Sequence, residues 1–224
     1  MDALVAISTV ADGSMFNREN PTDPTVVDNR KKFLALHDID IDHTTRVEVT
    51  FDFTLNDFCR YGEVSEKMKS DGMYFTAPTA HDALVTTTVG HALFLPLADC
   101  VGATFYDPIH GVLGLAHLGR HSLEQQGGIK FVQYLTKNYG TVPKDIKVWL
   151  SPAPGKDIYP IWALDNKGMK EVTFEQLNTA GILKDNIIDN PIETDKDKNY
   201  FSYSEFLKGH RDIDGDHAMI AVLR

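Results

Sequence analysis

Apolar runs separated by turn-forming residues dominate the middle of the chain. Runs of about four to eight apolar residues that are bounded by glycine, proline or asparagine are typical of buried β-strands. On this basis the sequence predicts strands over residues 46–53, 82–88, 92–97, 101–106, 112–116, 146–150 and 218–223. Residues 107–111, with the sequence DPIHG, carry turn residues between two of these runs and predict a β-hairpin.

Three segments show helical features instead. A proline-containing turn precedes residues 26–36, and Gly181 follows residues 174–179 as a C-terminal cap. Ser122 with a glutamine three residues later has the form of a capping box, which predicts a helix from Ser122 to about Tyr139. Strands in succession with helices between them favour an α+β fold with a mixed sheet.

Cys100 and His117 are the residues most suited to chemistry. Cys100 directly precedes the first strand of the predicted hairpin and His117 directly follows the second, so both should lie at one end of the hairpin. A thiol and an imidazole placed together can act as nucleophile and general base, or as two metal ligands. We therefore expect Cys100 and His117 to be in contact at a pocket mouth, with Asp99 or a backbone carbonyl orienting the imidazole.

The predicted helix start lies directly beyond this pair. Arg120, His121 and Ser122 lie at this helix start, which has free backbone N–H groups and a partial positive charge. The positive charge would lower the pKa of the nearby thiol, and the N–H groups would bind a phosphate or another anion. Gly127 and Gly128 are unfavourable inside a helix, so they predict the close approach of either backbone or ligand.

Four short motifs follow one another along the chain. They are HDALVT at residues 81–86, ADC at 98–100, AHLGR at 116–120 and YFSY at 200–203. Their sequences and their order resemble the YfiH-like family, also described as laccase-domain proteins or the polyphenol oxidase family, whose members are purine nucleoside enzymes. The resemblance implies mixed β-sheet layers flanked by helices in a single compact domain over residues 1–224. It also implies a purine nucleoside and phosphate as substrates, bound by Arg120, His121, Ser122 and Tyr203.

The same resemblance implies a zinc site. Its ligands would be Cys100, His117 and a further histidine, with one position left open for water or substrate. Two segments of this chain could carry that histidine, residues 47–53 and, in a shifted register, residues 58–62. Neither contains a histidine.

We expect Phe53, or Tyr61 in the shifted register, to take the place of the missing ligand. Zinc binding should then be weak, because zinc sites normally have at least three protein ligands. Cys59, His81 or His121 could complete the site. The chain has nine histidines, but they form neither a visible His₂Cys set nor the further copper sites that a laccase needs. This argues against a copper oxidase, so no copper is expected.

Three functions are therefore open. The first is phosphorolysis or deamination of adenosine or inosine assisted by zinc, with the purine base stacked on Tyr159 or Trp162. The second is a metal-free cysteine hydrolase or deamidase in which Cys100 is the nucleophile and His117 the base. The third is a degenerate family member that binds a ligand or partner without catalysis.

The overall composition limits the partners. A net charge of −10 argues against binding to nucleic acid or to an anionic membrane. The chain has no run of about eighteen apolar residues that could span a membrane. Two cysteines do not make a disulfide framework, and no basic segment precedes an apolar run near the first residue, so we expect a cytoplasmic protein. The sequence leaves the oligomeric state open.

Overall fold

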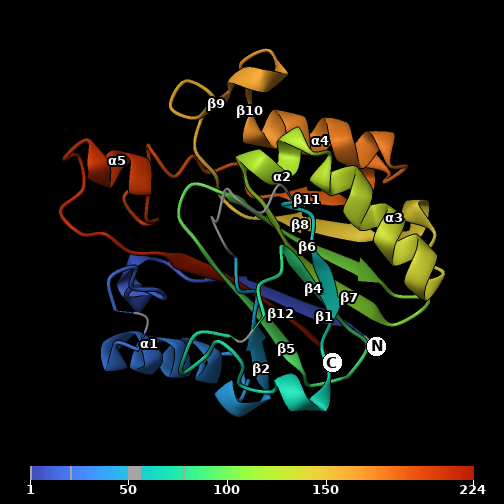
Figure 1. The fold of residues 1–224 in the computed structure, drawn as a ribbon, viewed down its shortest axis with the longest axis horizontal. Helices are drawn as coiled ribbons and strands as arrows, with labels where there is room; N and C mark the ends of the chain where they lie inside the picture. Colours follow the sequence, from blue (N-terminus) through green and yellow to red (C-terminus); the bar gives the residue numbers. More distant parts are fainter. Residues whose placement is uncertain (1, 21, 50–56, 78) are drawn as a thin grey trace.

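Layers of helices and sheets make up the molecule (Figure 1). The computed structural model describes residues 2–20, 22–49, 57–77 and 79–224. Helices α3 (Gly127–Tyr139) and α4 (Met169–Thr179) cover one face of a six-stranded sheet, and a four-stranded sheet packs on its other face. Helix α1 (Pro24–Ala35) covers the outer face of the four-stranded sheet. The predicted α+β fold, with mixed sheets flanked by helices, is confirmed.

The six-stranded sheet holds the predicted hairpin at its centre. Its strands are β3 (Tyr61–Glu63), β4 (Ala83–Thr86), β6 (Val101–Asp107), β7 (Val112–Leu118), β8 (Lys147–Leu150) and β11 (Ile187–Asp189). Within the described residues their order is β11-β8-β6-β7-β4-β3. The outer pairs β3–β4 and β8–β11 are parallel and the inner pairs antiparallel, so the sheet is mixed.

The four-stranded sheet joins the two ends of the chain. Its strands are β1 (Ala3–Ile7), β2 (Thr44–Arg46), β5 (Ala92–Leu97) and β12 (His217–Leu223). The last strand, β12, lies between β1 and β5 and is antiparallel to both, while β2 runs parallel to β5. A separate two-stranded sheet is formed by β9 (Pro160–Ile161) and β10 (Lys167–Gly168).

Alternation along the strands divides the core into layers. In β7, Val112 and Leu118 face the layer beneath α3 and α4, whereas Leu113 and Leu115 face the four-stranded sheet. Both faces of β7 are therefore buried, which is why its sequence reads as a continuous apolar run rather than as an alternation.

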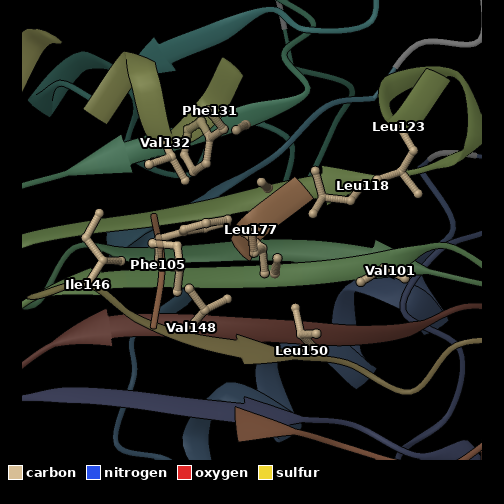
Figure 2. Close-up of a cluster of buried hydrophobic side chains, with 14 of the residues drawn as sticks. Val101, Phe105, Leu118, Leu123, Phe131, Val132, Ile146, Val148, Leu150 and Leu177 are labelled. Carbon is tan, nitrogen blue, oxygen red and sulfur yellow. The ribbon is translucent and has the colours of Figure 1, made fainter. Parts of the chain in front are cut away.

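Figure 2 shows the cluster between the six-stranded sheet and its helices. Phe105 of β6 and Phe131 of α3 meet edge to face with ring centroids 4.9 Å apart. Gly114 of β7 makes room for this ring, because a Cβ atom there would lie 2.7 Å from Cζ of Phe131. Ile146, directly before β8, and Leu177 of α4 belong to the same cluster.

Two predicted elements have different bounds. Of the strand predicted over 46–53, only Arg46 lies in a strand, which is β2. Residues 47–49 are irregular, although N of Val47 still donates to the backbone oxygen of Phe94 at 2.8 Å, and 50–53 lie outside the described residues. The helix predicted over 174–179 begins earlier, at Met169, because the side chain of Glu171 accepts a hydrogen bond from N of Gly168 at 3.3 Å. Among the described residues, no helix is both long and apolar enough to cross a membrane.

Candidate functional site

The open end of the β6–β7 hairpin brings Cys100 and His117 together. His117 pairs with Gly102 across the hairpin, and Cys100 directly precedes β6. A Cβ atom built on Gly119 would lie 2.6 Å from Cε1 of His117 and 3.2 Å from Sγ of Cys100. Both side chains therefore close around Gly119 within a few ångströms of each other, as the hairpin geometry predicts, and a larger residue at this glycine would displace them.

Two hollows meet at this pair. The larger cavity has a volume of about 630 Å³. Its lining includes Cys100, His117, Phe16, Arg18, Arg46, Glu48, Asp99, Tyr159, Tyr203 and Asp216. The smaller pocket, of about 120 Å³, is lined by Cys100, His117, Phe58, Asp82, Arg120, His121, Ser122 and Tyr159. Both hollows thus share a wall formed by Val49, Cys100, His117 and Tyr159.

Burial keeps both reactive groups neutral. It raises the pKa of the Cys100 thiol to about 12, helped by the nearby carboxylate of Asp99. It lowers the pKa of His117 to about 4. The expectation that a helix start would lower the thiol pKa is therefore wrong for the protein without bound ligand, because the loss of hydration outweighs the charges of Arg18 and Arg120.

Asp99 has a structural task next to this pair. It adopts a left-handed backbone conformation with φ of 73°. Its Oδ1 accepts a hydrogen bond from Oγ1 of Thr194 at 3.2 Å, and its Oδ2 accepts one from N of Ser204 at 2.6 Å. The carboxylate thereby holds the start of α5 (Tyr203–Leu207) against the hairpin, instead of the imidazole orientation that the sequence suggests.

Asp82 supplies a second buried carboxylate on the wall of the smaller pocket. Its Oδ2 accepts from both N and Nε of Arg60, at 2.9 and 3.1 Å, and its backbone oxygen accepts from N of His117 at 2.8 Å. Its Oδ1, Nε of Arg120 and Oγ of Ser122 are buried without a hydrogen-bond partner among the described residues. Buried polar atoms in this state are rare in folded proteins and mark places where a ligand or water completes the structure.

The predicted capping box at Ser122 is wrong. Helix α2 (Arg120–Glu124) already begins after Gly119, and Gln126, with a φ of 64°, separates it from α3. Gly127 passes so close to Ser122 that a side chain could not fit between them, and N of Gly128 donates to Gln176 at 2.9 Å. The two glycines thus allow α3 to pack closely against Ser122 of α2 and Gln176 of α4.

Arg120 and His121 begin α2 on the wall of the smaller pocket. Nη2 of Arg120 lies 3.2 Å from Nε2 of His121, and the His121 ring stacks on Phe58 with centroids 4.9 Å apart. Tyr203, predicted to bind substrate, lines the larger cavity instead. Trp162 is 74% exposed and lines neither hollow, which leaves Tyr159 as the aromatic residue of that pair at the site.

Sequence reasoning missed the charged residues of the larger cavity. Arg18 donates to Asp214 at 2.7 Å and to Asp216 at 2.5 Å, and its guanidinium lies 4.4 Å from the ring centroid of Tyr203. Burial raises the pKa of Asp216 to about 6. The carboxylates cluster in residues 212–216, but Arg18 lies nearly two hundred positions away from them, so no local pattern indicates that they pair.

The residues present do not make a complete zinc site. Among the described ranges, no three His, Cys, Asp or Glu side chains gather as metal ligands would. The hydroxyl of Tyr61 donates to the backbone oxygen of Gly127 at 3.0 Å and its ring packs on α3, so the shifted register is wrong. Phe53 lies outside the described residues. Among the described residues, Cys100 and His117 are the two donors in place, which is fewer than the three of catalytic zinc sites.

The alternative third ligands are not equally placed. Cys59 lies 4.0 Å from the backbone oxygen of Ser122 and lines neither hollow. His81 packs its ring against Gly62. His121 shares the smaller pocket with the thiol and the imidazole.

Comparison with known proteins places these features in context. The family model "Multi-copper polyphenol oxidoreductase laccase" matches residues 21–166. A curated relative, "Purine nucleoside phosphorylase YlmD" of Bacillus subtilis, is 29% identical over 141 residues, which cover 62% of this chain and 49% of that protein. The chain thus spans about half the length of this relative in the match.

Solved structures share the fold over nearly the whole chain. The Bacillus licheniformis hypothetical protein YfiH has a TM-score of 0.83 at 21% identity, over 99% of this chain and 93% of that one. YlmD from Geobacillus stearothermophilus has a TM-score of 0.81 at 20% identity, over 99% and 92%. Neisseria meningitidis protein NMB0706 has a TM-score of 0.73 at 14% identity, over 99% and 94%.

Proposed function

The chain belongs to the multi-copper polyphenol oxidoreductase laccase family, with the YfiH-like fold, and we propose that its larger cavity binds a purine nucleoside. The observation that carries the proposal is the thiol and imidazole pair on the inner wall of a cavity of about 630 Å³. Cavities of about 300–1,000 Å³ are typical for small organic ligands. The name of the B. subtilis relative, a purine nucleoside phosphorylase, supports this class of ligand.

The walls suit the two halves of such a reaction. Phe16, Tyr159 and Tyr203 offer aromatic surface to a purine base in the larger cavity. Arg120 and His121 offer nitrogen donors to phosphate in the smaller pocket. A nucleoside and phosphate bound in this way would meet at the wall that holds the thiol and imidazole.

Cys100 and His117 are the residues that would hold a zinc ion, as the family resemblance implies. Because two donors fall short of three, the proposed reaction is not routed through a metal. We therefore expect the protein to bind a purine nucleoside even where it does not turn the nucleoside over. Phosphorolysis or deamination of adenosine and inosine should be slow or absent even with added zinc and phosphate, since a Lewis acid contributes several kcal/mol and thus about thousands-fold in rate.

A thermal-shift titration tests the proposal. Adenosine or inosine at about 100 times its Kd should stabilise the protein by about 2.7 kcal/mol, a rise in Tm of several degrees. The Cys100→Ala variant should show a smaller rise. Cys59→Ala, which removes the other thiol, is the matched control and should behave as the wild type. No shift with any purine nucleoside would reject the proposal.

A metal-free cysteine hydrolase has less support. Such enzymes need a thiolate, and burial holds the pKa of Cys100 at about 12 while it keeps His117 neutral. Rapid alkylation of Cys100 by iodoacetamide near neutral pH in metal-free buffer would restore this alternative. Rapid zinc-dependent turnover of adenosine that is lost in Cys100→Ala would show that a further residue completes the metal site.

A further inference from the structure

Glu48 is a partly buried carboxylate on the wall of the larger cavity, and the proposed reaction does not use it. It lies two residues beyond β2, and its side chain is 15% exposed. Its Oε2 accepts hydrogen bonds from Nη2 of Arg46 and, at 3.1 Å, from N of Ala77. One oxygen of this carboxylate is thus fixed from two directions, which sets the orientation of the other.

The other oxygen, Oε1, is free to meet a ligand. It has no hydrogen-bond partner among the described residues, and it is not among the polar atoms sealed inside the protein. Glu48 lines the larger cavity, so this oxygen is the carboxylate atom left for a ligand bound there. In contrast, the unpartnered Oδ1 of Asp82 is sealed from solvent.

Two buried arginines explain why a negative charge is kept here. Arg46, whose side chain is 2% exposed, pairs with Glu48, and the buried Arg30 is near enough for its charge to interact with that of Arg46. Burial and the positive charge of Arg46 lower the pKa of Arg30 to about 9, while the negative charge of Glu48 opposes the change. Glu48 is therefore the counter-charge of a buried basic pair, held in place before any ligand arrives.

We propose that Oε1 of Glu48 accepts hydrogen bonds from the 2′- and 3′-hydroxyls of the nucleoside's ribose, so that the cavity selects ribose over deoxyribose. This inference rests on the proposed binding of a purine nucleoside. A fixed carboxylate is the usual acceptor for ribose hydroxyls in nucleotide sites, because it has only acceptor atoms. Phe16, whose ring lies over Arg46 at 5.1 Å, provides the neighbouring surface for the apolar face of the sugar or base.

The wild-type protein allows a first test that needs no variant. Isothermal titration with adenosine, 2′-deoxyadenosine and 2′,3′-dideoxyadenosine should give Kd values that rise as hydroxyls are removed. The dideoxy compound should bind about tenfold to hundredfold more weakly than adenosine, as expected for hydrogen bonds to a charged acceptor. Equal affinities for adenosine and the dideoxy compound would overturn the inference and leave the proposed function intact. Binding of no purine nucleoside would remove both.

Variants of Glu48 identify the acceptor. In Glu48→Gln, Arg46 and N of Ala77 both donate, so the amide oxygen should take the place of Oε2 and the NH₂ group should face the cavity. Adenosine should then bind about tenfold more weakly, while 2′,3′-dideoxyadenosine changes by less than about twofold. Glu48→Asp keeps the charge for the arginines but withdraws the oxygen, and it should show the same selective loss.

The matched control is Glu175→Gln on α4, where Nζ of Lys167 lies 2.7 Å from the carboxylate, far from the cavity. It should leave both affinities unchanged. Circular dichroism and Tm report whether each variant is folded. If the Glu48 variants weaken adenosine and its dideoxy analogue equally, Glu48 acts only by holding the fold, and the ribose assignment is wrong.

Discussion

The polar groups at the two ends of the β6–β7 hairpin differ in how completely they are hydrogen-bonded. At the turn end, Oδ1 of Asp107 accepts from N of Ile109 at 2.8 Å and N of His110 at 3.1 Å, and its Oδ2 lies 2.7 Å from Nδ1 of His110. At the open end, the carboxylate of Asp82 and the hydroxyl of Ser122 each keep a buried atom without a partner among the described residues. The two ends belong to one pair of strands, so the difference lies in the residues placed there.

This difference suggests that the turn end of the hairpin serves stability and the open end serves ligand binding. At the turn, both oxygens of the Asp107 carboxylate have partners within the turn, so this carboxylate stabilises the hairpin and is not left for a ligand. Unpartnered buried atoms destabilise the folded chain, so their retention around Cys100 and His117 fits a site that a ligand completes. Changes at the open end should therefore alter binding more than stability, and changes at the turn end should do the reverse.

Supplying a third metal donor should have the largest effect. Phe53→His should tighten zinc binding more than about hundredfold, since structural zinc binding corresponds to roughly 3 kcal/mol or more per ligand. Competition with a chromogenic chelator measures the affinity. Tyr61→His is the control, because its side chain points to Gly127 and α3. A gain from Tyr61→His and none from Phe53→His would contradict this assignment.

Acid should weaken the fold through buried histidines. Burial lowers the pKa of His117 to about 4 and that of His217 to about 3. Below about pH 6.5 the unfolded chain protonates each histidine first, so stability falls by ~1.4 kcal/mol per pH unit and histidine until the folded pKa is reached. Asp216, whose pKa is raised to about 6, protonates first in the folded chain and offsets one of the two between about pH 6 and 4.

Urea unfolding between pH 7 and pH 4.5 measures this slope. His217 has both ring nitrogens buried without hydrogen-bond partners among the described residues, so His217→Leu should remove the slope of one histidine and keep the fold at pH 7. His43→Gln changes an exposed histidine and should leave the slope as it is. An unchanged slope in His217→Leu would show that this histidine is not the source of acid sensitivity.

Removing the acceptors at the turn end should affect stability alone. Asp107→Ala leaves two backbone N–H groups without their side-chain acceptor and should destabilise the protein by about 2 kcal/mol, or roughly 4–8 °C in Tm. The Kd for adenosine should not change. A marked loss of nucleoside affinity in the folded variant would mean that the two ends are coupled.

The smallest stability effect is expected from Ser122→Ala. Its hydroxyl has no partner among the described residues, so the free energy of unfolding should change by less than about 0.5 kcal/mol. Phosphate should nevertheless protect the variant less than the wild type in thermal-shift titrations, because Ser122 lines the smaller pocket. A large loss of Tm without any change in phosphate protection would place Ser122 among the structural residues.

Local sequence patterns predicted the central strands but not the edges. β5, β6, β7 and β12 are contiguous apolar runs that are buried on both faces, so their composition alone is informative. β1 is half-buried throughout and β3 contains Gly62, so neither shows a strong pattern. Their pairing depends on partners that the local sequence does not contain.

The same rule applies to the site. Cys100 and His117 could be predicted because one hairpin holds both. Arg18 and Glu48 could not, since Arg18 pairs with carboxylates nearly two hundred positions away and Glu48 is held by N of Ala77. The capping box at Ser122 misled because the left-handed Gln126 interrupts a helical pattern that otherwise reads as continuous.

The position of β12 determines when the four-stranded sheet can form during synthesis. This strand, the last of the described chain, lies between β1 and β5 and hydrogen-bonds to both. During synthesis the six-stranded sheet can form before residues 217–223 are made. Until then, the edges of β1 and β5 that pair with β12 have no partner. A chain that lacks residues 217–223 would therefore have no strand between β1 and β5 in its second sheet. Its unpaired strand edges would make it a substrate for proteases and chaperones.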